Sequence, residues 1–159
     1  MEKIASFTVD HLRLLTGLYV SRVDDVNGTP VTTFDIRMTR PNEEPPMDNP
    51  GIHCFEHLGA TFLRNDPEWK QKVIYFGPMG CRTGFYLLLA GSHTPEGILD
   101  LIRRMFDFIA GFEGDIPGAS PKDCGNYLDM NPGQAKFYAR KYIAEVLEKP
   151  EPARFTYPD

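Results

Sequence analysis

The two histidines of the segment His53-Cys54-Phe55-Glu56-His57 are four residues apart, which is about one turn of an α-helix. On a helix, their imidazoles lie on the same side with Cβ atoms roughly 6 Å apart, so that they can hold one metal ion. Glu56 lies beside them, where a carboxylate can move protons in a metal-assisted reaction. The alternative is a helix with two surface histidines and a solvated glutamate, because this pattern is weak evidence without a third ligand.

Cys124 is the candidate for the third ligand, because it lies in a segment flanked by glycine, Lys122-Asp123-Cys124-Gly125-Asn126. Three protein ligands leave a fourth position open for water or substrate, as in catalytic sites. Two imidazoles and one thiolate suit Zn²⁺ or Fe²⁺ better than Mg²⁺ or Ca²⁺. Cys54 points about 100° away from His53 and is interpreted as a packing thiol. The alternative is a closed structural metal site, with His93 as its fourth ligand.

Cys81 is the second cysteine that could do chemistry. It follows Gly77-Pro78-Met79-Gly80, a loop whose glycines let the backbone come close to a ligand. The adjacent Arg82 and a nearby metal centre would both favour its thiolate form. Cys81 is therefore a candidate reactive thiol, and the alternative is a buried cysteine at the end of a strand.

Three other polar residues each allow two interpretations. Arg64 lies roughly 10 Å along the helix from the histidine pair, where it could hold an anionic end of a substrate or pair with a structural carboxylate. Arg37 is expected in the middle of a strand, either as a solvated outer residue or as a ligand for a substrate carboxylate. His11 is a site candidate or a simple surface residue.

An antiparallel sheet is expected to position these residues. Asn27-Gly28 is a strong hairpin signal, and Gly77-Pro78-Met79-Gly80-Cys81 is expected to break the third strand. Strands are predicted over residues 18–23, 31–38, 72–76 and 82–90.

Three helices are expected as well, and each begins with a capping residue followed by proline: Asn49-Pro50, Thr94-Pro95 and Asn131-Pro132. They are predicted over about 50–64, 95–111 and 133–149, with a loose tail after Pro150. This order of elements predicts an α+β fold, a two-layer sandwich with an antiparallel β-sheet packed against α-helices, in a single metal-dependent domain over residues 1–159.

Composition excludes several classes of partner. The net charge is −5 and the basic residues are scattered, so no nucleic-acid surface is expected. No segment approaches the roughly 20 apolar residues of a membrane span, and the N-terminal residues lack the apolar run of a signal peptide. Three cysteines, an odd number, favour metal-binding or reactive thiols in a reducing cytoplasm.

Five motifs in order resemble those of the S-ribosylhomocysteine lyase (LuxS) family, over nearly the whole chain. They are Ser6-Phe7-x-x-Asp10-His11, Phe34-Asp35-Ile36-Arg37, His53-x-x-Glu56-His57-Leu58, Gly77-Pro78-Met79-Gly80-Cys81-Arg82-Thr83-Gly84-Phe85-Tyr86 and Cys124-Gly125. One departure is Tyr75-Phe76-Gly77, where many members have Asp-Ile-Ser, so that a carboxylate expected near the homocysteine end of the substrate is absent here.

The resemblance implies a bacterial, cytoplasmic homodimer with active sites at the subunit interface. It implies cleavage of S-ribosyl-L-homocysteine to L-homocysteine and 4,5-dihydroxy-2,3-pentanedione, the precursor of the quorum-sensing signal autoinducer-2, by carbonyl migration and β-elimination. It implies one Fe²⁺ per subunit, replaceable by Zn²⁺ or Co²⁺, on His53, His57 and Cys124. Acid–base roles then fall on Glu56 and Cys81, and substrate contacts from the partner subunit on Ser6, His11 and Arg37.

A competing class is peptide deformylase, which also uses two histidines and one cysteine. Its signature H-E-x-x-H has the glutamate directly after the first histidine, whereas Glu56 directly precedes the second one. Metallopeptidases with H-x-x-E-H usually need a downstream glutamate as third ligand and a longer chain.

Overall fold

The computed structural model describes residues 2, 4 and 7–158 of the chain. Four strands form one antiparallel sheet in the order β1-β2-β4-β3, with bounds β1 Gly17–Val26, β2 Thr29–Arg37, β3 Val73–Pro78 and β4 Gly84–Ala90. The predicted hairpin turn is confirmed, because Asn27 and Gly28 both have positive φ, 54° and 83°, as a two-residue turn of type I′ requires. β3 ends at Pro78, inside the segment predicted to break the third strand, although it includes Gly77 and Pro78, which the prediction left out.

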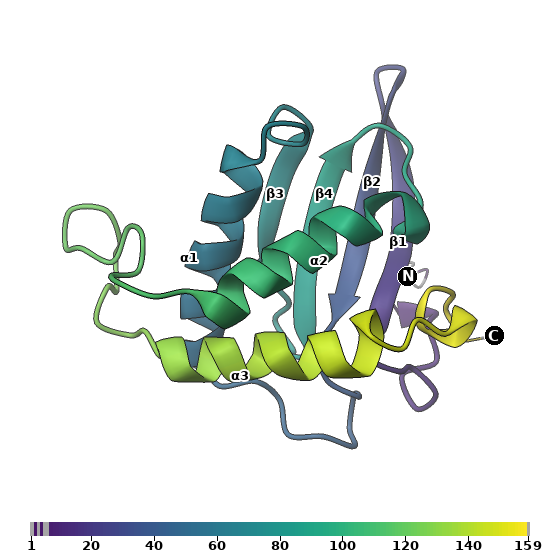
Figure 1. Ribbon diagram of the computed structural model, residues 1–159. Helices are drawn as coiled ribbons and strands as arrows, with labels where there is room; N and C mark the ends of the chain where they lie inside the picture. Colours follow the sequence, from purple (N-terminus) through teal and green to yellow (C-terminus); the bar gives the residue numbers. More distant parts are fainter. Residues whose placement is uncertain (1, 3, 5–6, 159) are drawn as a thin grey trace.

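Three helices, α1 Asn49–Asn65, α2 Pro95–Gly111 and α3 Pro132–Tyr142, cover one face of this sheet (Figure 1). The predicted α+β two-layer sandwich is confirmed. Thr94 and Asn131 cap their helices as predicted. The cap of α1 is Asp48 rather than Asn49, because the Asp48 carboxylate accepts a hydrogen bond from the backbone N–H of Gly51.

The last helix is shorter than predicted. Regular α-helix ends at Tyr142, and a π-helical turn, Ile143–Leu147, follows it. No helix among the described residues is long and apolar enough to cross a membrane.

The core lies between the helices and the sheet and is rich in aromatic rings. Phe55 of α1 stacks on Phe85 of β4 with ring centroids 4.8 Å apart, and it meets Phe106 of α2 edge-on at 5.3 Å. Phe106 stacks in turn on Tyr142 of α3 at 4.3 Å. These contacts join all three helices to the sheet and thereby fix the orientation of α1, which carries the predicted metal ligands.

The opposite face of the sheet carries polar and aromatic residues, because side chains alternate along each strand. Tyr19, Asp35 and Tyr86 lie side by side on adjacent strands β1, β2 and β4. The C-terminal segment packs here, so the prediction of a loose tail is wrong. Tyr157 stacks on Tyr19 with centroids 4.8 Å apart, and Arg154 donates a hydrogen bond of 2.8 Å to the carbonyl of Thr16.

Candidate active site

The structure brings the three predicted metal ligands together. One nitrogen of His53, one of His57 and the Sγ atom of Cys124 all lie within 4.8 Å of one another. The histidines come from successive turns of α1, and Cys124 comes from the long loop between α2 and α3. Sequence spacing alone predicts that His53 and His57 lie together, whereas the position of Cys124 next to these two histidines depends on the fold.

The two imidazoles are oriented by backbone carbonyl groups. Nδ1 of His53 lies 3.0 Å from the carbonyl oxygen of Asp129, and Nδ1 of His57 lies 2.8 Å from that of Pro117. Because a carbonyl can only accept, each Nδ1 carries the proton and each Nε2 presents its lone pair. This is the usual orientation of histidines that bind a metal through Nε2, so the donor set fits a metal ion.

The loop that carries Cys124 is shaped to approach α1. The backbone N–H of Cys124 donates to the carbonyl of Ser120 at 3.0 Å, and that of Asn126 points at the Cys124 sulfur at 3.4 Å. Gly118 has a φ of 73°, and a Cβ added to it would lie only 3.3 Å from Nδ1 of His57. Neither Gly118 nor the carbonyl partners of the histidines are predicted from the sequence, where the one signal for them is the Gly-Pro-rich composition of this loop.

Glu56 lies beside the ligand group, as the helical spacing predicts. Its Oε2 atom is 4.0 Å from Nε2 of His57, and its side chain is about one-third exposed. The carboxylate is therefore close enough to exchange protons with a molecule held at the open side of the group. Its role as an acid–base residue stays a prediction.

The predicted fourth ligand of a closed site lies elsewhere. Nε2 of His93 is 2.9 Å from the carbonyl oxygen of Ala90, and its ring packs edge-on against Trp69. Among the described residues, the cluster therefore has three protein ligands and an open fourth position. This arrangement is the one expected of a catalytic centre rather than of a closed structural site.

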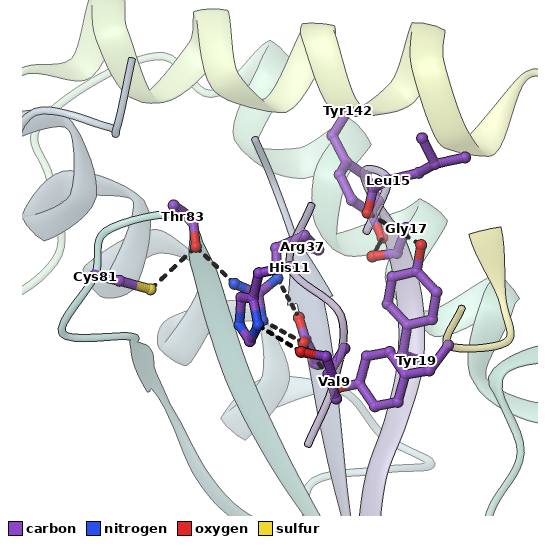
Figure 2. A network of polar contacts seen from close by, with 11 residues as sticks. Val9, His11, Leu15, Gly17, Tyr19, Arg37, Cys81, Thr83 and Tyr142 are labelled. Carbon is purple, nitrogen blue, oxygen red and sulfur yellow. Dashed lines mark hydrogen bonds and ion pairs between the residues drawn. The ribbon is translucent and has the colours of Figure 1, made fainter. Parts of the chain in front are cut away.

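A second group of predicted site residues lines a cavity of about 270 Å³ on the sheet face that the helices leave uncovered. His11, Arg37 and Cys81 all line this cavity, as does Tyr157 from the C-terminal segment. His11 is held by a contact of 2.9 Å between its Nδ1 and the carbonyl oxygen of Val9 (Figure 2). Ser6, predicted as a substrate contact, lies outside the described residues.

Arg37 is buried, so the interpretation as a solvated outer residue is wrong. Its Nε and Nη2 donate to the two carboxylate oxygens of Asp35 at 3.1 and 2.5 Å, and its Nη1 donates to the hydroxyl of Thr83 at 2.6 Å. Burial acts to lower the pKa of Arg37, but the charge and hydrogen bonds of Asp35, together with the nearby Cys81 and Tyr157, outweigh it, so that the pKa is raised overall. The result is a permanent cation fixed beside the cavity.

Cys81 is exposed, which excludes the alternative of a buried cysteine at a strand end. Its Sγ atom lies 3.0 Å from the hydroxyl oxygen of Thr83. Cys54, in contrast, is buried in the core, where burial raises its pKa to about 11. The interpretation of Cys54 as a packing thiol is thus confirmed.

Arg64 has a structural role, but its partners are backbone carbonyls rather than the carboxylate that the structural alternative predicts. Its Nη1 and Nη2 donate to the carbonyl oxygens of Val73 and Ile74 at 2.8 and 2.9 Å. These bonds tie the end of α1 to the start of β3. The interpretation of Arg64 as a substrate contact has no support from the contacts of its guanidinium.

The chain is similar to proteins of one family throughout its length. Residues 4–153 match the family model described as S-ribosylhomocysteinase (LuxS). A curated S-ribosylhomocysteine lyase from Clostridium beijerinckii is 55% identical over 159 residues, which cover all of both chains. One from Finegoldia magna is 54% identical over the same full length, and one from Phocaeicola vulgatus is 53% identical over 99% of this chain and 98% of its own.

Proposed function

This chain belongs to the LuxS family of S-ribosylhomocysteinases, and we propose that it cleaves S-ribosyl-L-homocysteine to L-homocysteine and 4,5-dihydroxy-2,3-pentanedione. The observation that carries the proposal is the open three-ligand group of His53, His57 and Cys124. A metal ion held by such a group can polarise a substrate carbonyl, which is the chemistry that this cleavage needs. A hydride carrier would be needed only for a net oxidation or reduction. The overall reaction is an isomerisation and an elimination, so no oxidant is required.

We propose Fe²⁺ as the resident ion, one per subunit, with Zn²⁺ or Co²⁺ able to replace it. Nε2 of both histidines and the Cys124 thiolate would hold it, since this mixed nitrogen and sulfur set suits borderline-soft cations. When bound, the ion supplies Lewis-acid polarisation of a substrate carbonyl, which acidifies the neighbouring C–H group. A thiolate ligand is favoured by the reducing bacterial cytoplasm that we propose as the location.

Glu56 and Cys81 are the proposed proton shuttles. A base removes the proton next to the carbonyl and returns one to the adjacent carbon, so that the carbonyl moves from C1 to C2 and then to C3 of the sugar. Removal of the C4 proton from the C3 ketone then forms the C4–C5 double bond and breaks the C5–S bond, and the released thiolate takes up a proton. The resulting C4 enol tautomerises to the dione, as its hydroxyl proton is lost and C5 gains one. Each of the two groups can act first as base and then as acid, as this sequence demands.

The proposed assembly is a homodimer in which each active site draws on both chains. Within one chain, the metal group lies on α1, which packs on one face of the sheet, while the cavity of Cys81, His11 and Arg37 opens on the opposite face. The resemblance assigned only Ser6, His11 and Arg37 to the partner subunit. Because Cys81 lines the same cavity as His11 and Arg37, we assign it to the same half of the site, the half contributed by the partner chain. Cys81 of one chain would then act at the metal group of the other chain.

One hydrophobic core supports the proposal that residues 1–159 act as a single domain. Buried residues of the sheet and of α1, α2 and α3 form one continuous cluster. Both halves of the site are therefore mounted on the same core, and their relative position within a chain is fixed.

The test is release of thiol from S-ribosylhomocysteine by the purified, Fe²⁺-loaded protein kept free of oxygen. We expect release that stops on chelation and returns with Fe²⁺ or Co²⁺, and no hydrolysis of formyl peptides. Hydrolysis of formyl peptides without thiol release would overturn the proposal in favour of a deformylase.

A further inference from the structure

A row of hydrogen bonds connects the buried ion pair of β2 to the exposed sulfur of Cys81 (Figure 2). Asp35 holds Arg37 through both carboxylate oxygens, Nη1 of Arg37 reaches the hydroxyl of Thr83 at 2.6 Å, and that hydroxyl lies 3.0 Å from Sγ of Cys81. Among the described side chains, Thr83 is the one that hydrogen-bonds to both Arg37 and Cys81. The guanidinium therefore reaches the sulfur through one hydroxyl group.

The direction of these bonds follows from the chemistry of the groups. A guanidinium has only donors, so the Thr83 oxygen must accept from Arg37. The hydroxyl proton of Thr83 is then left to be donated, and Sγ of Cys81 is the partner within reach. A thiolate is a much better acceptor than a thiol, and a hydroxyl already polarised by a cation is a better donor, so this bond stabilises the thiolate form.

Thr83 is held firmly enough to keep this geometry before any substrate binds. Its side chain is buried, and its own carbonyl oxygen accepts hydrogen bonds from the backbone N–H groups of Met38 and Thr39 at 2.9 and 3.1 Å. As a β-branched residue it has few χ1 rotamers to choose from. On the other side, Arg37 and Asp35 are 4% and 1% exposed, so the cation cannot swing away into water.

We propose that Thr83 is a positioning residue that conveys the charge of Arg37 to the sulfur of Cys81. This inference rests on the proposed role of Cys81 as a proton shuttle. A shuttle must exist as a base for part of each cycle, and an exposed thiol in water is mostly protonated near pH 7. Through Thr83, a buried cation can favour the basic form without blocking the space above the sulfur.

The opposing interpretation is that Thr83 merely satisfies a hydrogen bond of Arg37. Thr83→Val keeps the shape of the side chain and removes the hydroxyl, and Thr83→Ser restores the hydroxyl with less bulk. Thr33→Val is the matched control, because Thr33 lies on the same strand face as Arg37, is buried, and has a hydroxyl with no hydrogen-bond partner among the described residues.

The measurement is the rate at which iodoacetamide alkylates Cys81 in the metal-loaded protein, followed by mass spectrometry of the Cys81 peptide across pH 5–9. Only the thiolate reacts, and the peptide readout separates Cys81 from Cys54 and Cys124. We expect Thr83→Val to slow alkylation at pH 7 by about tenfold and to move the pH profile to higher pH, since a hydrogen bond to a charged group is lost. Thr83→Ser and Thr33→Val should keep the parent profile.

Because alkylation needs no substrate, it is independent of the cleavage assay that tests the proposed function. A folded Thr83→Val protein whose alkylation profile superimposes on that of the parent would overturn the inference, even if the parent cleaves S-ribosylhomocysteine. Should Thr83→Val fail to fold, Thr83→Ala carries the same expectation. In the cleavage assay, a loss confined to kcat with little change in KM should accompany the shifted profile.

Discussion

The Sγ atom of Cys124 lies 3.4 Å from Nε2 of His53, although the two residues are 71 positions apart in the chain. The contact closes the loop between α2 and α3 onto the side of α1. It depends on carbonyl groups of that same loop, since Pro117 and Asp129 orient the two histidines. The loop therefore supplies one ligand and positions the other two.

Cys124→Ala should lose most of the bound metal and all cleavage activity, because two imidazoles alone hold such an ion weakly. Metal content per chain, measured after gel filtration, is the readout. The control is Cys54→Ala, which should keep the metal but lower the free energy of unfolding by about 1–2 kcal/mol through lost packing. Full metal occupancy in Cys124→Ala would show that the third ligand is another residue.

Mixed dimers test the division of the site between two chains. Cys81→Ala and Cys124→Ala are each expected to be inactive, but a refolded mixture should regain activity, because one site of each mixed dimer has both halves intact. A mixture of Cys81→Ala with His11→Ala should stay inactive, since both residues line the cavity of the same chain. Activity in the second mixture but not in the first would place Cys81 beside the metal of its own chain.

Glu56→Gln should fold, assemble and retain its metal, yet lose elimination by about 10²–10⁴-fold, as expected when an acid–base group is removed. Exchange of the sugar C2 proton for deuterium, followed by NMR, would show whether the first or a later proton transfer fails. Glu113→Gln is the control, because Glu113 is exposed and pairs with Lys136. If Glu56→Gln released homocysteine at the parent rate with the metal bound, another group would have to move the protons.

The sequence predicted the ligands better than it predicted their surroundings, for physical reasons. The spacing of His53 and His57 is local, so helical geometry alone brings them together. The burial of Arg37 depends on Asp35, two residues away, and on Thr83 and Tyr157 from distant segments. No local pattern encodes a buried pair of this kind, and a mid-strand arginine is outward-facing in most sheets.

The tail illustrates the same limit. Residues 150–159 contain three prolines and no apolar periodicity, which is typical of a loose end. The described part of this segment nevertheless packs: Tyr157 stacks on Tyr19 of β1, Arg154 donates a hydrogen bond to the carbonyl of Thr16, and Phe155 lies against the core. The placement of Cys81 and Cys124 on opposite sides of the sheet could not be predicted either, because both lie in loops whose packing depends on distant segments.

Tyr157→Phe tests the contribution of the tail to stability. The phenol donates a hydrogen bond of 2.8 Å to Asp35, and burial followed by the charge of Asp35 raises its pKa above 10.0. Because the folded-state pKa is the higher one, this stabilisation is complete below about pH 10 and is lost as the pH rises further. The substitution keeps the stacking on Tyr19, so we expect it to lower the free energy of unfolding at pH 7 by about 1–2 kcal/mol and to weaken its alkaline decline. Urea unfolding at pH 7 and pH 10.5 would measure both, and an unchanged pH dependence would mean that other tyrosines account for it.

The placement of the metal group and the Cys81 cavity on opposite sides of one sheet has a consequence for inhibition by defective subunits. In the proposed dimer, a chain that lacks Cys124 alone spoils one of the two sites of a mixed dimer and leaves the other intact. A chain that lacks both Cys81 and Cys124 spoils both, because it brings a broken half to each. Such a chain would act as a dominant inhibitor. When each site needs residues from two chains, one defective chain can inactivate both sites of a mixed dimer.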